Sequence, residues 1–309
     1  MTVESSPNAA PAETRCGFVA LIGAPNVGKS TLVNALVGSK VTIVSRKVQT
    51  TRALIRGIVI EDNAQIILVD TPGIFSPKRR LDRAMVSTAW SGAHDADLVC
   101  VLIDAKAGLD EEADAILGKL ATVQHPKILV LNKIDLIPRE KLLALAQAAN
   151  ARLKFEHTFM ISALAGDGVD DLRRTLAKMV PPGPFHYPED QMSDAPLRHL
   201  AAEITREKIY RQLHQELPYQ STVETDSWTE RKDKSVRIEQ TIFVERESQR
   251  KIVLGKGGAT IKSIGADARK EIAEIVGQPV HLLLFVKVRE NWGDDPDRYR
   301  EMGLEFPKG

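Results

Sequence analysis

The chain has 309 residues, of which 43% are hydrophobic and 27% charged, and its formal net charge is +1. This composition is ordinary for a globular protein of about two domains, and it excludes a disulfide-stapled scaffold and a highly charged disordered chain. No apolar run approaches the ~20 residues of a membrane span, and the first residues lack the basic start and apolar stretch of a secretory signal.

The amino-terminal residues and the cysteines indicate the setting of the protein. Residues 1–14 are rich in Ser, Pro, Ala and Glu, which predicts a disordered tail. The two cysteines, Cys16 and Cys100, make no disulfide framework and are typical of a reducing compartment. We therefore expect a cytoplasmic protein.

Strand and helix patterns alternate in the first half of the chain. Strand patterns lie at residues 17–22, 55–61, 65–69, 98–104, 127–131 and 157–161, and helical patterns at residues 28–37 and 169–180. This order predicts a mostly parallel sheet with helices on both faces, with one antiparallel edge strand from the consecutive pair at 55–61 and 65–69. Residues 15–182 are expected to form one α/β domain.

The first strand leads into a glycine-rich loop of the form G-x-x-x-x-G-K-[ST]. In such a loop the backbone N–H groups curl around phosphates, and the following helix points its positive end at them. We expect Lys29 to reach the β- and γ-phosphates and Ser30 to ligate Mg²⁺. The predicted phosphate-binding residues are Gly23, Ala24, Pro25, Asn26, Val27, Gly28, Lys29, Ser30 and Thr31.

Two segments that follow the loop are expected to sense the γ-phosphate. Residues 45–52 are polar, basic and without periodicity, so they form a flexible loop from which a Thr can complete the Mg²⁺ shell, and we favour Thr51 over Thr50. A later strand ends at Asp70, whose carboxylate can hold Mg²⁺ through water, and Gly73 can offer its N–H to the γ-phosphate. The full second string is Asp70, Thr71, Pro72 and Gly73, and the predicted metal ligands are Ser30, Thr51 and Asp70.

Two further strings predict that the base is guanine. Asp135 can accept hydrogen bonds from N1–H and the N2 amine of guanine, and adenine would leave that carboxylate unpaired. Asn132 and Lys133 would brace the same loop, and Ser162 with Ala163 would bring a backbone N–H to guanine O6. The order of the strings matches the path of a bound nucleotide, so we predict a switch that binds GTP and GDP.

Catalysis in this class consists mainly of positioning and charge neutralisation. Many such enzymes orient the attacking water with a Gln directly after the Asp-x-x-Gly motif, but that position here is Ile74, which cannot hydrogen-bond. The side-chain oxygen of Asn26 can help to coordinate a monovalent cation, and we hypothesise that K⁺ plays part of the role of an arginine finger. The predicted catalytic residues are Asn26, Lys29, Thr51 and Gly73.

A Pro-Pro-Gly-Pro string at residues 181–184 marks the domain boundary, and residues 183–193 are predicted to be a stiff linker. The second domain, residues 194–290, shows the order α-β-β-α-α-β, with Asp194 as the expected N-cap of its first helix. Its strand patterns lie at residues 223–230, 236–244 and 280–288. Residues 291–309 are assigned as a carboxy-terminal tail.

The second domain carries a G-x-x-G turn between two helices, at residues 255–258. In this element order the turn matches the type II KH module, an α+β fold whose loop clamps a single-stranded RNA backbone. Between residues 246 and 270 there are seven basic residues and two acidic ones, which supports nucleic-acid binding. The predicted RNA-binding residues are Arg246, Lys251, Gly255, Lys256, Gly257, Gly258 and Lys262, while Trp228, Trp292 and Tyr219 are assigned no role.

Over about residues 15–295 these strings closely resemble the bacterial Era GTPases. The strings at residues 23–30 and 45–52 are similar to motifs of that family, and those at residues 216–219, 244–247 and 264–265 resemble it specifically. The resemblance implies a GTP-hydrolysing switch that binds the 3′ end region of 16S rRNA through its KH domain and acts in assembly of the 30S ribosomal subunit. It also implies a cytoplasmic protein with some peripheral association at the inner face of the membrane, and we expect a monomer.

Two alternative interpretations remain. The chain can be a GTPase of the same superfamily whose second domain binds protein or tRNA, although neither a duplicated first domain nor a cysteine-bearing carboxy-terminal region is present to mark one. It can also be chiefly an RNA-binding module with a vestigial nucleotide site. The intact Lys29, Ser30, Asp70 and Asp135 argue against that loss.

Overall fold

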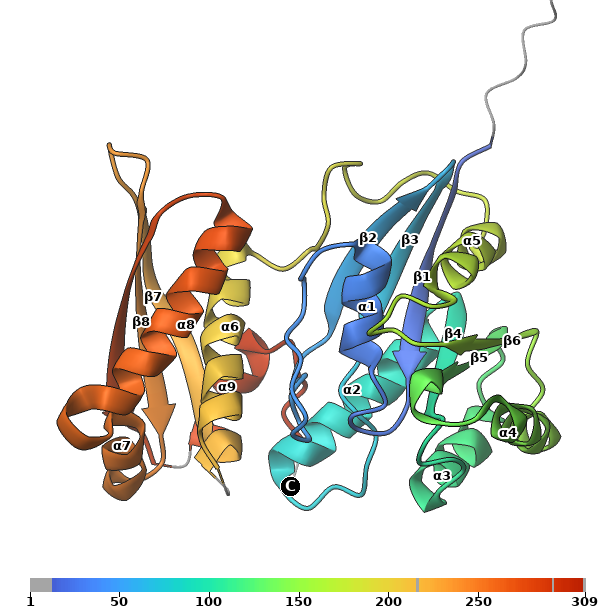
Figure 1. Ribbon diagram of the computed structural model, residues 1–309, viewed down its shortest axis with the longest axis horizontal. Coiled ribbons are helices and arrows are strands. Elements are labelled where there is room, and N and C mark those ends of the chain that lie inside the picture. The colour runs from blue at the N-terminus through green and yellow to red at the C-terminus, as the bar shows by residue number, and fades with distance from the viewer. Residues whose placement is uncertain (1–12, 215–216, 291, 308–309) are drawn as a thin grey trace, which may run out of the picture.

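The computed structural model describes residues 13–214, 217–290 and 292–307. The first half of the chain forms a six-stranded sheet and the second half a three-stranded sheet, and the two lie side by side (Figure 1). The predicted disordered tail, residues 1–14, lies outside the described residues except for residues 13 and 14. None of the helices in the described part of the chain has the length and apolar character needed to cross a bilayer.

The first sheet has the strand order β2-β3-β1-β4-β5-β6. Only β2 runs antiparallel to its neighbour, and the other pairs are parallel, which confirms the predicted antiparallel edge. The strands are β1 (Arg15–Ile22), β2 (Ile55–Glu61), β3 (Ala64–Asp70), β4 (Leu98–Asp104), β5 (Lys127–Asn132) and β6 (His157–Ile161).

Helices cover both faces of this sheet (Figure 1). They are α1 (Lys29–Val37), α2 (Arg80–Asp95), α3 (Glu111–Leu120), α4 (Arg139–Arg152) and α5 (Val169–Met179). Because parallel strands are covered on both sides, they are expected to be apolar throughout rather than alternating. Every residue of β3 is buried, as are six of the seven residues of β4. The parallel strands end at one edge of the sheet, so the loops after β1, β3, β5 and β6 meet there.

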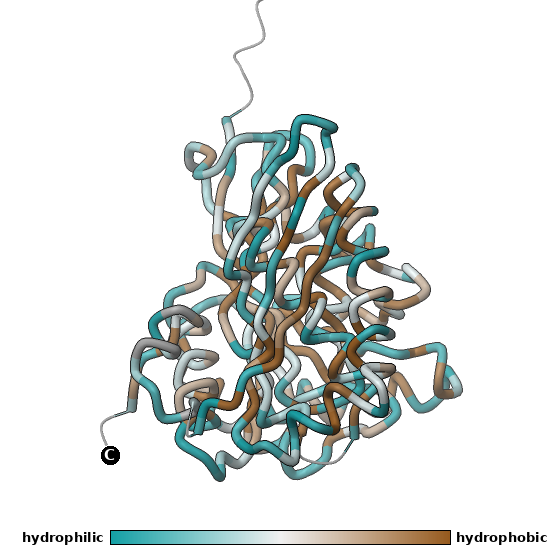
Figure 2. The backbone as a smooth tube through the Cα atoms, turned by 90° about the vertical axis from the view of Figure 1, so that its left-hand side faces the viewer, coloured by the Kyte–Doolittle hydropathy of each residue, from teal (hydrophilic) through white to brown (hydrophobic). Residues whose placement is uncertain are grey.

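The second domain has the predicted order α-β-β-α-α-β. Its elements are α6 (Leu197–Gln212), β7 (Ser221–Glu230), β8 (Val236–Val244), α7 (Glu247–Leu254), α8 (Ala259–Val276) and β9 (Val280–Val288). β7 pairs antiparallel with β8, and β8 pairs parallel with β9. In the view of Figure 2 apolar residues lie along strands and helices alike, and the loops at the surface are mostly polar. α6 and α8 pack on one face of this sheet, and α6 is the helix nearer the first domain (Figure 1).

The prediction that Asp194 caps α6 is wrong. Pro196 occupies the N-cap position, and the Asp194 carboxylate instead accepts hydrogen bonds from the backbone N–H and the guanidinium of Arg56 in β2. The preceding residues add to the free edge of β2, where the N–H of Ile58 donates to the carbonyl of Met192. The end of the linker therefore protects an edge strand, and this long-range pairing outweighs the local preference of Asp for a cap.

Within the residues that the structure describes, the segment assigned as a carboxy-terminal tail is folded. It forms a short helical turn (Trp292–Asp294) and helix α9 (Pro296–Glu301). Its side chains Trp292, Tyr299 and Leu304 are buried against Leu81 and Met85 of α2 in the first domain. The end of the chain therefore returns from the second domain to the first.

Candidate functional site

The phosphate loop lies between β1 and α1. Its backbone needs a glycine at position 28, and it leads into a helix whose first N–H groups are free. Gly28 has φ 101°, and a Cβ at this position would lie 2.2 Å from the side-chain nitrogen of Asn132. That nitrogen donates to the carbonyl of Val27 at 2.8 Å, which ties the loop to the end of β5. α1 begins at Lys29 with no side-chain cap, so its first N–H groups point to where a phosphate would sit.

Lys29 is buried inside this loop. Its ammonium donates to the carbonyls of Gly23 at 3.1 Å and Ala24 at 3.0 Å. Burial lowers the pKa of Lys29 to about 8, and the nearby Asp70 carboxylate opposes that shift only in part. A desolvated cation held by neutral carbonyls is poised to bind an anion such as a phosphate.

Three predicted metal ligands meet at the carboxyl end of β3. The Ser30 hydroxyl donates to the Asp70 carboxylate at 2.7 Å and lies 2.9 Å from the Thr51 hydroxyl, which is 3.4 Å from the same carboxylate. Asp70 is fully buried, and this burial raises the pKa of its carboxyl. Its Oδ1 has no hydrogen-bond partner among the residues that the structure describes. A cluster of oxygen donors with an unsatisfied, desolvated carboxylate oxygen fits Mg²⁺.

Two neighbouring threonines occupy different places in this cluster. Thr51 faces Ser30 and Asp70, whereas the Thr50 hydroxyl turns away to Ser45, 2.6 Å from its hydroxyl, and to the carbonyl of Lys47 at 2.7 Å. The geometry therefore supports Thr51 as the metal ligand. Thr42, whose hydroxyl donates to the Asp70 carboxylate at 2.9 Å, was missed because it stands in a stretch without a motif.

The loop after β3 lies directly on the phosphate loop. A Cβ on Gly73 would lie 2.8 Å from Cα of Pro25, and the N–H of Ile74 donates to the carbonyl of Gly23 at 3.1 Å. Thr71 is buried and its hydroxyl donates to the carbonyl of Leu21 at 2.6 Å, so its side chain anchors the loop to β1. Ile74 is itself part of the hydrophobic core, in keeping with its lack of a catalytic role.

The predicted base-binding strings converge on the same loop. The Asn132 side-chain oxygen accepts from the N–H groups of Lys133 and Ala163 at 2.9 and 3.0 Å, which joins the ends of β5 and β6. The Lys133 ammonium donates to the carbonyl of Asn26 and to the Asp104 carboxylate, each at 2.6 Å. Asp104, at the end of β4, was not recognised from sequence.

The remaining base-binding residues lie beside this frame. Asp135 is exposed in a short helical turn (Ile134–Leu136) directly after Lys133, where its carboxylate is free to meet a base. Ser162 is buried, and its hydroxyl accepts from the N–H of Ala165 at 3.3 Å, which shapes the loop that presents Ala163. The structure therefore gathers the phosphate, metal and base strings along one edge of the sheet.

The predicted RNA-binding residues form a second candidate site. Gly255, which ends α7, and Gly257 and Gly258 in the following turn (Lys256–Gly258) all have positive φ. Arg246, Lys251, Lys256 and Lys262 are exposed around this turn. Two exposed apolar residues were missed by sequence reasoning, Ile252 on α7 at 55% and Phe285 on β9 at 46% exposure. Phe285 alternates with Leu284 and Val286, which pack toward α7 and α8, so it lies on the opposite face of the sheet. Exposed basic groups around an open glycine turn suit a single-stranded RNA backbone.

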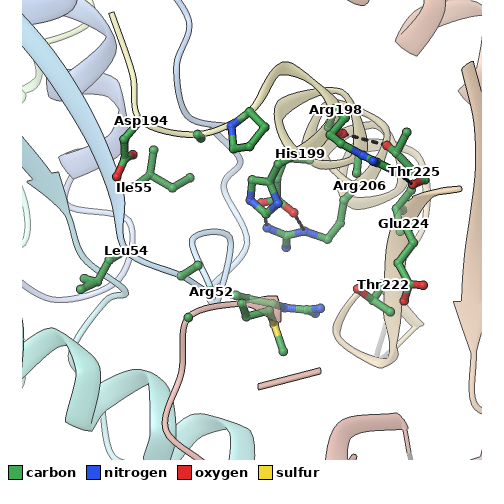
Figure 3. Close-up of a pocket in the computed structure, with 18 residues that line it drawn as sticks. Arg52, Leu54, Ile55, Asp194, Arg198, His199, Arg206, Thr222, Glu224 and Thr225 are labelled. Atoms are coloured by element: carbon green, nitrogen blue, oxygen red, sulfur yellow. Dashed lines mark hydrogen bonds and ion pairs between the residues drawn. The ribbon is translucent and has the colours of Figure 1, made fainter. Parts of the chain in front are cut away.

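The two domains meet along a cleft of about 540 Å³, lined by Arg52, His199, Arg206 and Glu224 among others (Figure 3). None of the predicted nucleotide-binding residues lines it. Beside it Trp292 is buried, donates from its indole N–H to the carbonyl of Gln220 at 3.0 Å and lies 5.4 Å from the Arg52 guanidinium. Trp292 therefore has a structural role and does not stack bases.

Known proteins match this chain along nearly its whole length. A family model described as a 50S ribosome-binding GTPase matches residues 18–133, and a KH domain model matches residues 216–293. The GTPase Era of Bradyrhizobium diazoefficiens is 87% identical over 308 residues, covering 100% of both chains. The GTPase Era of Brucella suis is 68% identical over 295 residues, covering 96% of this chain and 95% of that one.

Two solved structures share the whole arrangement. A variant of Aquifex aeolicus Era bound to GDP and aluminium fluoride matches with a TM-score of 0.89 at 38% identity, covering 94% of this chain and 99% of that chain. Era in complex with MgGDPNP and nucleotides 1506–1542 of 16S ribosomal RNA matches with a TM-score of 0.88 at 39% identity and the same coverage. The similarity therefore extends over both domains.

Proposed function

Because this chain belongs to the Era family of GTPases, we propose that its guanine-nucleotide state controls how its KH domain binds the 3′ end region of 16S rRNA during assembly of the 30S ribosomal subunit. The observation that carries the proposal is the meeting of Ser30, Thr51 and Asp70 beside the phosphate loop. A relative with both domains, solved with MgGDPNP and this part of the rRNA, supports the link between the two sites.

The nucleotide would lie along the carboxyl edge of the first sheet. Lys29 and the amino end of α1 bind its phosphates, and Asp135 selects guanine. Ser30 and Thr51 would hold Mg²⁺ directly and Asp70 through water, and the ion supplies neutralisation of the phosphate charge. Gly73 offers its N–H to the γ-phosphate, so the loop after β3 reports whether that group is present.

Hydrolysis is expected to be slow, since the apolar Ile74 stands where a water-orienting Gln would be. Asn26 is exposed at the mouth of the phosphate loop with φ 62°, and Lys133 fixes its carbonyl. We propose that K⁺, held partly by the Asn26 side chain, supplies charge that an arginine finger supplies elsewhere. GTP hydrolysis in matched K⁺ and Na⁺ buffers checks this, and equal rates contradict it.

The KH domain would clamp the RNA backbone at the turn after α7. A Cβ added to Gly257 would meet no atom within 4 Å, so the space beside this backbone is open and phosphates can approach it closely. Phosphate contacts from Arg246, Lys251, Lys256 and Lys262 should make binding weaken with salt. The protein is proposed to act as a monomer in the cytoplasm, in keeping with its buried free thiols Cys16 and Cys100, with some peripheral association at the inner face of the membrane.

Crosslinking followed by sequencing of the bound RNA, with GTP analogue and with GDP, tests the proposal. We expect the 3′ end of 16S rRNA to be recovered, in amounts that depend on the nucleotide. Recovery of tRNA, or of protein alone, would favour the alternative in which the second domain has another partner.

A further inference from the structure

The segment that carries Thr51 belongs structurally to both domains. Val41 packs in the core of the first domain, whereas Ile43, two residues on, is fully buried in the core of the second beside Leu200 and Ile204 of α6. Since both side chains are buried, the path of the chain between α1 and Thr51 depends on where α6 lies.

One face of α6 then contacts the segment residue by residue. The Glu207 carboxylate accepts from the N–H of Val44 at 2.9 Å, and the Tyr210 hydroxyl donates to the carbonyl of Gln49 at 3.3 Å. The carbonyl of Leu213, at the end of the helix, accepts from the Lys47 ammonium. The positions Arg206, Glu207, Tyr210 and Leu213 share one helical face, so α6 offers a continuous template for this segment.

The contact nearest the metal ligands comes from Arg206. This side chain is 1% exposed, and its guanidinium donates to the carbonyl of Thr50, the residue directly before Thr51. The Glu203 carboxylate holds the guanidinium through both of its oxygens, one of them accepting from Nε at 2.8 Å. A charged group fixed by a paired carboxylate on a helix holds its acceptor in a narrow range of positions.

The residue after Thr51 is held from the same side. The Arg52 guanidinium donates to the carbonyl of Ser221 and to the Tyr210 hydroxyl, each at 2.9 Å. Figure 3 shows Arg206 from α6 and Arg52 from the segment around the cleft between the domains. Thr51 therefore projects toward Ser30 and Asp70 from a stretch of backbone whose two flanking residues are anchored in the second domain.

We propose that Arg206 is a positioning residue for the GTP site: it fixes the Thr50 carbonyl so that Thr51 completes the Mg²⁺ shell, and efficient GTP hydrolysis thus requires the second domain. The inference rests on the proposed function of the nucleotide site. α6 also packs through Ala201 and Ile204 against Ala268 and Ile272 of α8, the helix that begins at the G-x-x-G turn. Because coupling between two sites is reciprocal, the state of the nucleotide site should also affect α6 and the helix α8 that packs on it.

The test compares Arg206→Gln with Arg198→Gln in the full-length protein. Arg198 is an exposed arginine on the same helix, bonded to the carbonyl of Thr225 within the second domain, so its substitution removes the same charge without touching the segment. Each variant is assayed for GDP affinity, GTP turnover and the Mg²⁺ concentration that gives half-maximal turnover.

For Arg206→Gln we expect GDP affinity within about twofold of wild type, because Thr51 is a ligand only in the γ-phosphate state. Turnover should fall about tenfold and the Mg²⁺ requirement should rise, since a misplacement of about 1 Å can cost on the order of 100-fold in rate. Arg198→Gln should match wild type in all three assays. In a Thr51→Ala background, Arg206→Gln should add almost nothing to the loss.

Unchanged turnover and Mg²⁺ requirement in Arg206→Gln would overturn the inference, as would additive losses in the double variant. A parallel loss of GDP affinity would show a general structural defect. Arg206→Lys then repeats the test, because it keeps a cation beside Glu203 but lacks the length and the planar fork with which the guanidinium spans that carboxylate and the Thr50 carbonyl. Turnover of the wild-type protein is measured alongside. Its absence would refute the proposed nucleotide site, whereas normal wild-type turnover with no effect of Arg206→Gln would refute only the role of Arg206.

Discussion

Nucleotide binding should take up a proton at Lys29. Burial lowers the pKa of this ammonium to about 8 in the ligand-free protein, from 10.5 for an ordinary lysine. Nucleotide phosphates placed beside the ammonium favour its charged form and raise that pKa again. The ligand-free protein therefore loses the Lys29 proton as the pH rises through about 8, and binding restores it.

The size of the effect follows from this pKa. At a pH of about 8 half of the ligand-free molecules carry the proton, so binding should take up about half a proton per nucleotide. Between pH 7 and about 8.5 the affinity for GDP should fall about fourfold from this source alone. The unfolded chain binds more protons than the native one between about 8 and 10.5, so this lysine also makes the ligand-free protein more stable as pH rises through that window.

Isothermal titration calorimetry in two buffers of different ionisation enthalpy measures the uptake directly. The experiment stays at or below about pH 8.5, where the guanine ring keeps its own N1 proton. Lys29→Met is the matched control, because it lacks the titrating group and should bind GDP weakly with no uptake near pH 8. Tight GDP binding by wild type with no proton uptake at pH 8 would refute the argument that burial has shifted this group.

Three further variants test the base assignment, the RNA clamp and the docking of the last helix. Asp135→Asn should reduce GTP affinity at least about tenfold and raise affinity for xanthosine triphosphate, because the amide can no longer accept from both guanine donors; unchanged GTP affinity in a competition assay counts against the base assignment. Gly257→Asp combined with Gly258→Asp should abolish single-stranded RNA binding while sparing GDP affinity, and RNA binding that survives in a gel-shift assay places the clamp elsewhere. Trp292→Ala should lower the free energy of unfolding in urea by about 3 kcal/mol, since it empties a buried site between α2 and the end of the chain. A loss below about 1 kcal/mol would mean that this segment does not dock on α2 in solution.

The features predicted well from sequence are those that a short string determines locally. The phosphate loop has glycines where φ is positive or space is lacking, and a Lys and a Ser at the first turn of the helix, so the motif carries its own geometry. The strands of the first sheet were predicted because buried parallel strands are apolar throughout. The structure turns Thr51 toward Asp70 and Thr50 toward Ser45, and the role of Thr51 as a metal ligand stays a prediction.

The features that were missed depend on contacts between distant parts of the chain. Ile43 has no local pattern that shows it entering the core of another domain, and Trp292 has none that shows it packing near α2. Asp is a common helix cap, but the Asp194 carboxylate instead accepts hydrogen bonds from the backbone N–H and the guanidinium of Arg56 in β2. Because local propensity is worth only about 1 kcal/mol, such tertiary pairings override it.

The affinity of the full-length protein for a single-stranded RNA with the 16S 3′ end sequence, measured at one salt concentration with a GTP analogue and with GDP, is the most direct test. A nucleotide site that is mechanically joined to the KH domain through α6 predicts binding at least about fivefold tighter with the GTP analogue. Equal affinities in the two nucleotide states would contradict a switch that acts on RNA.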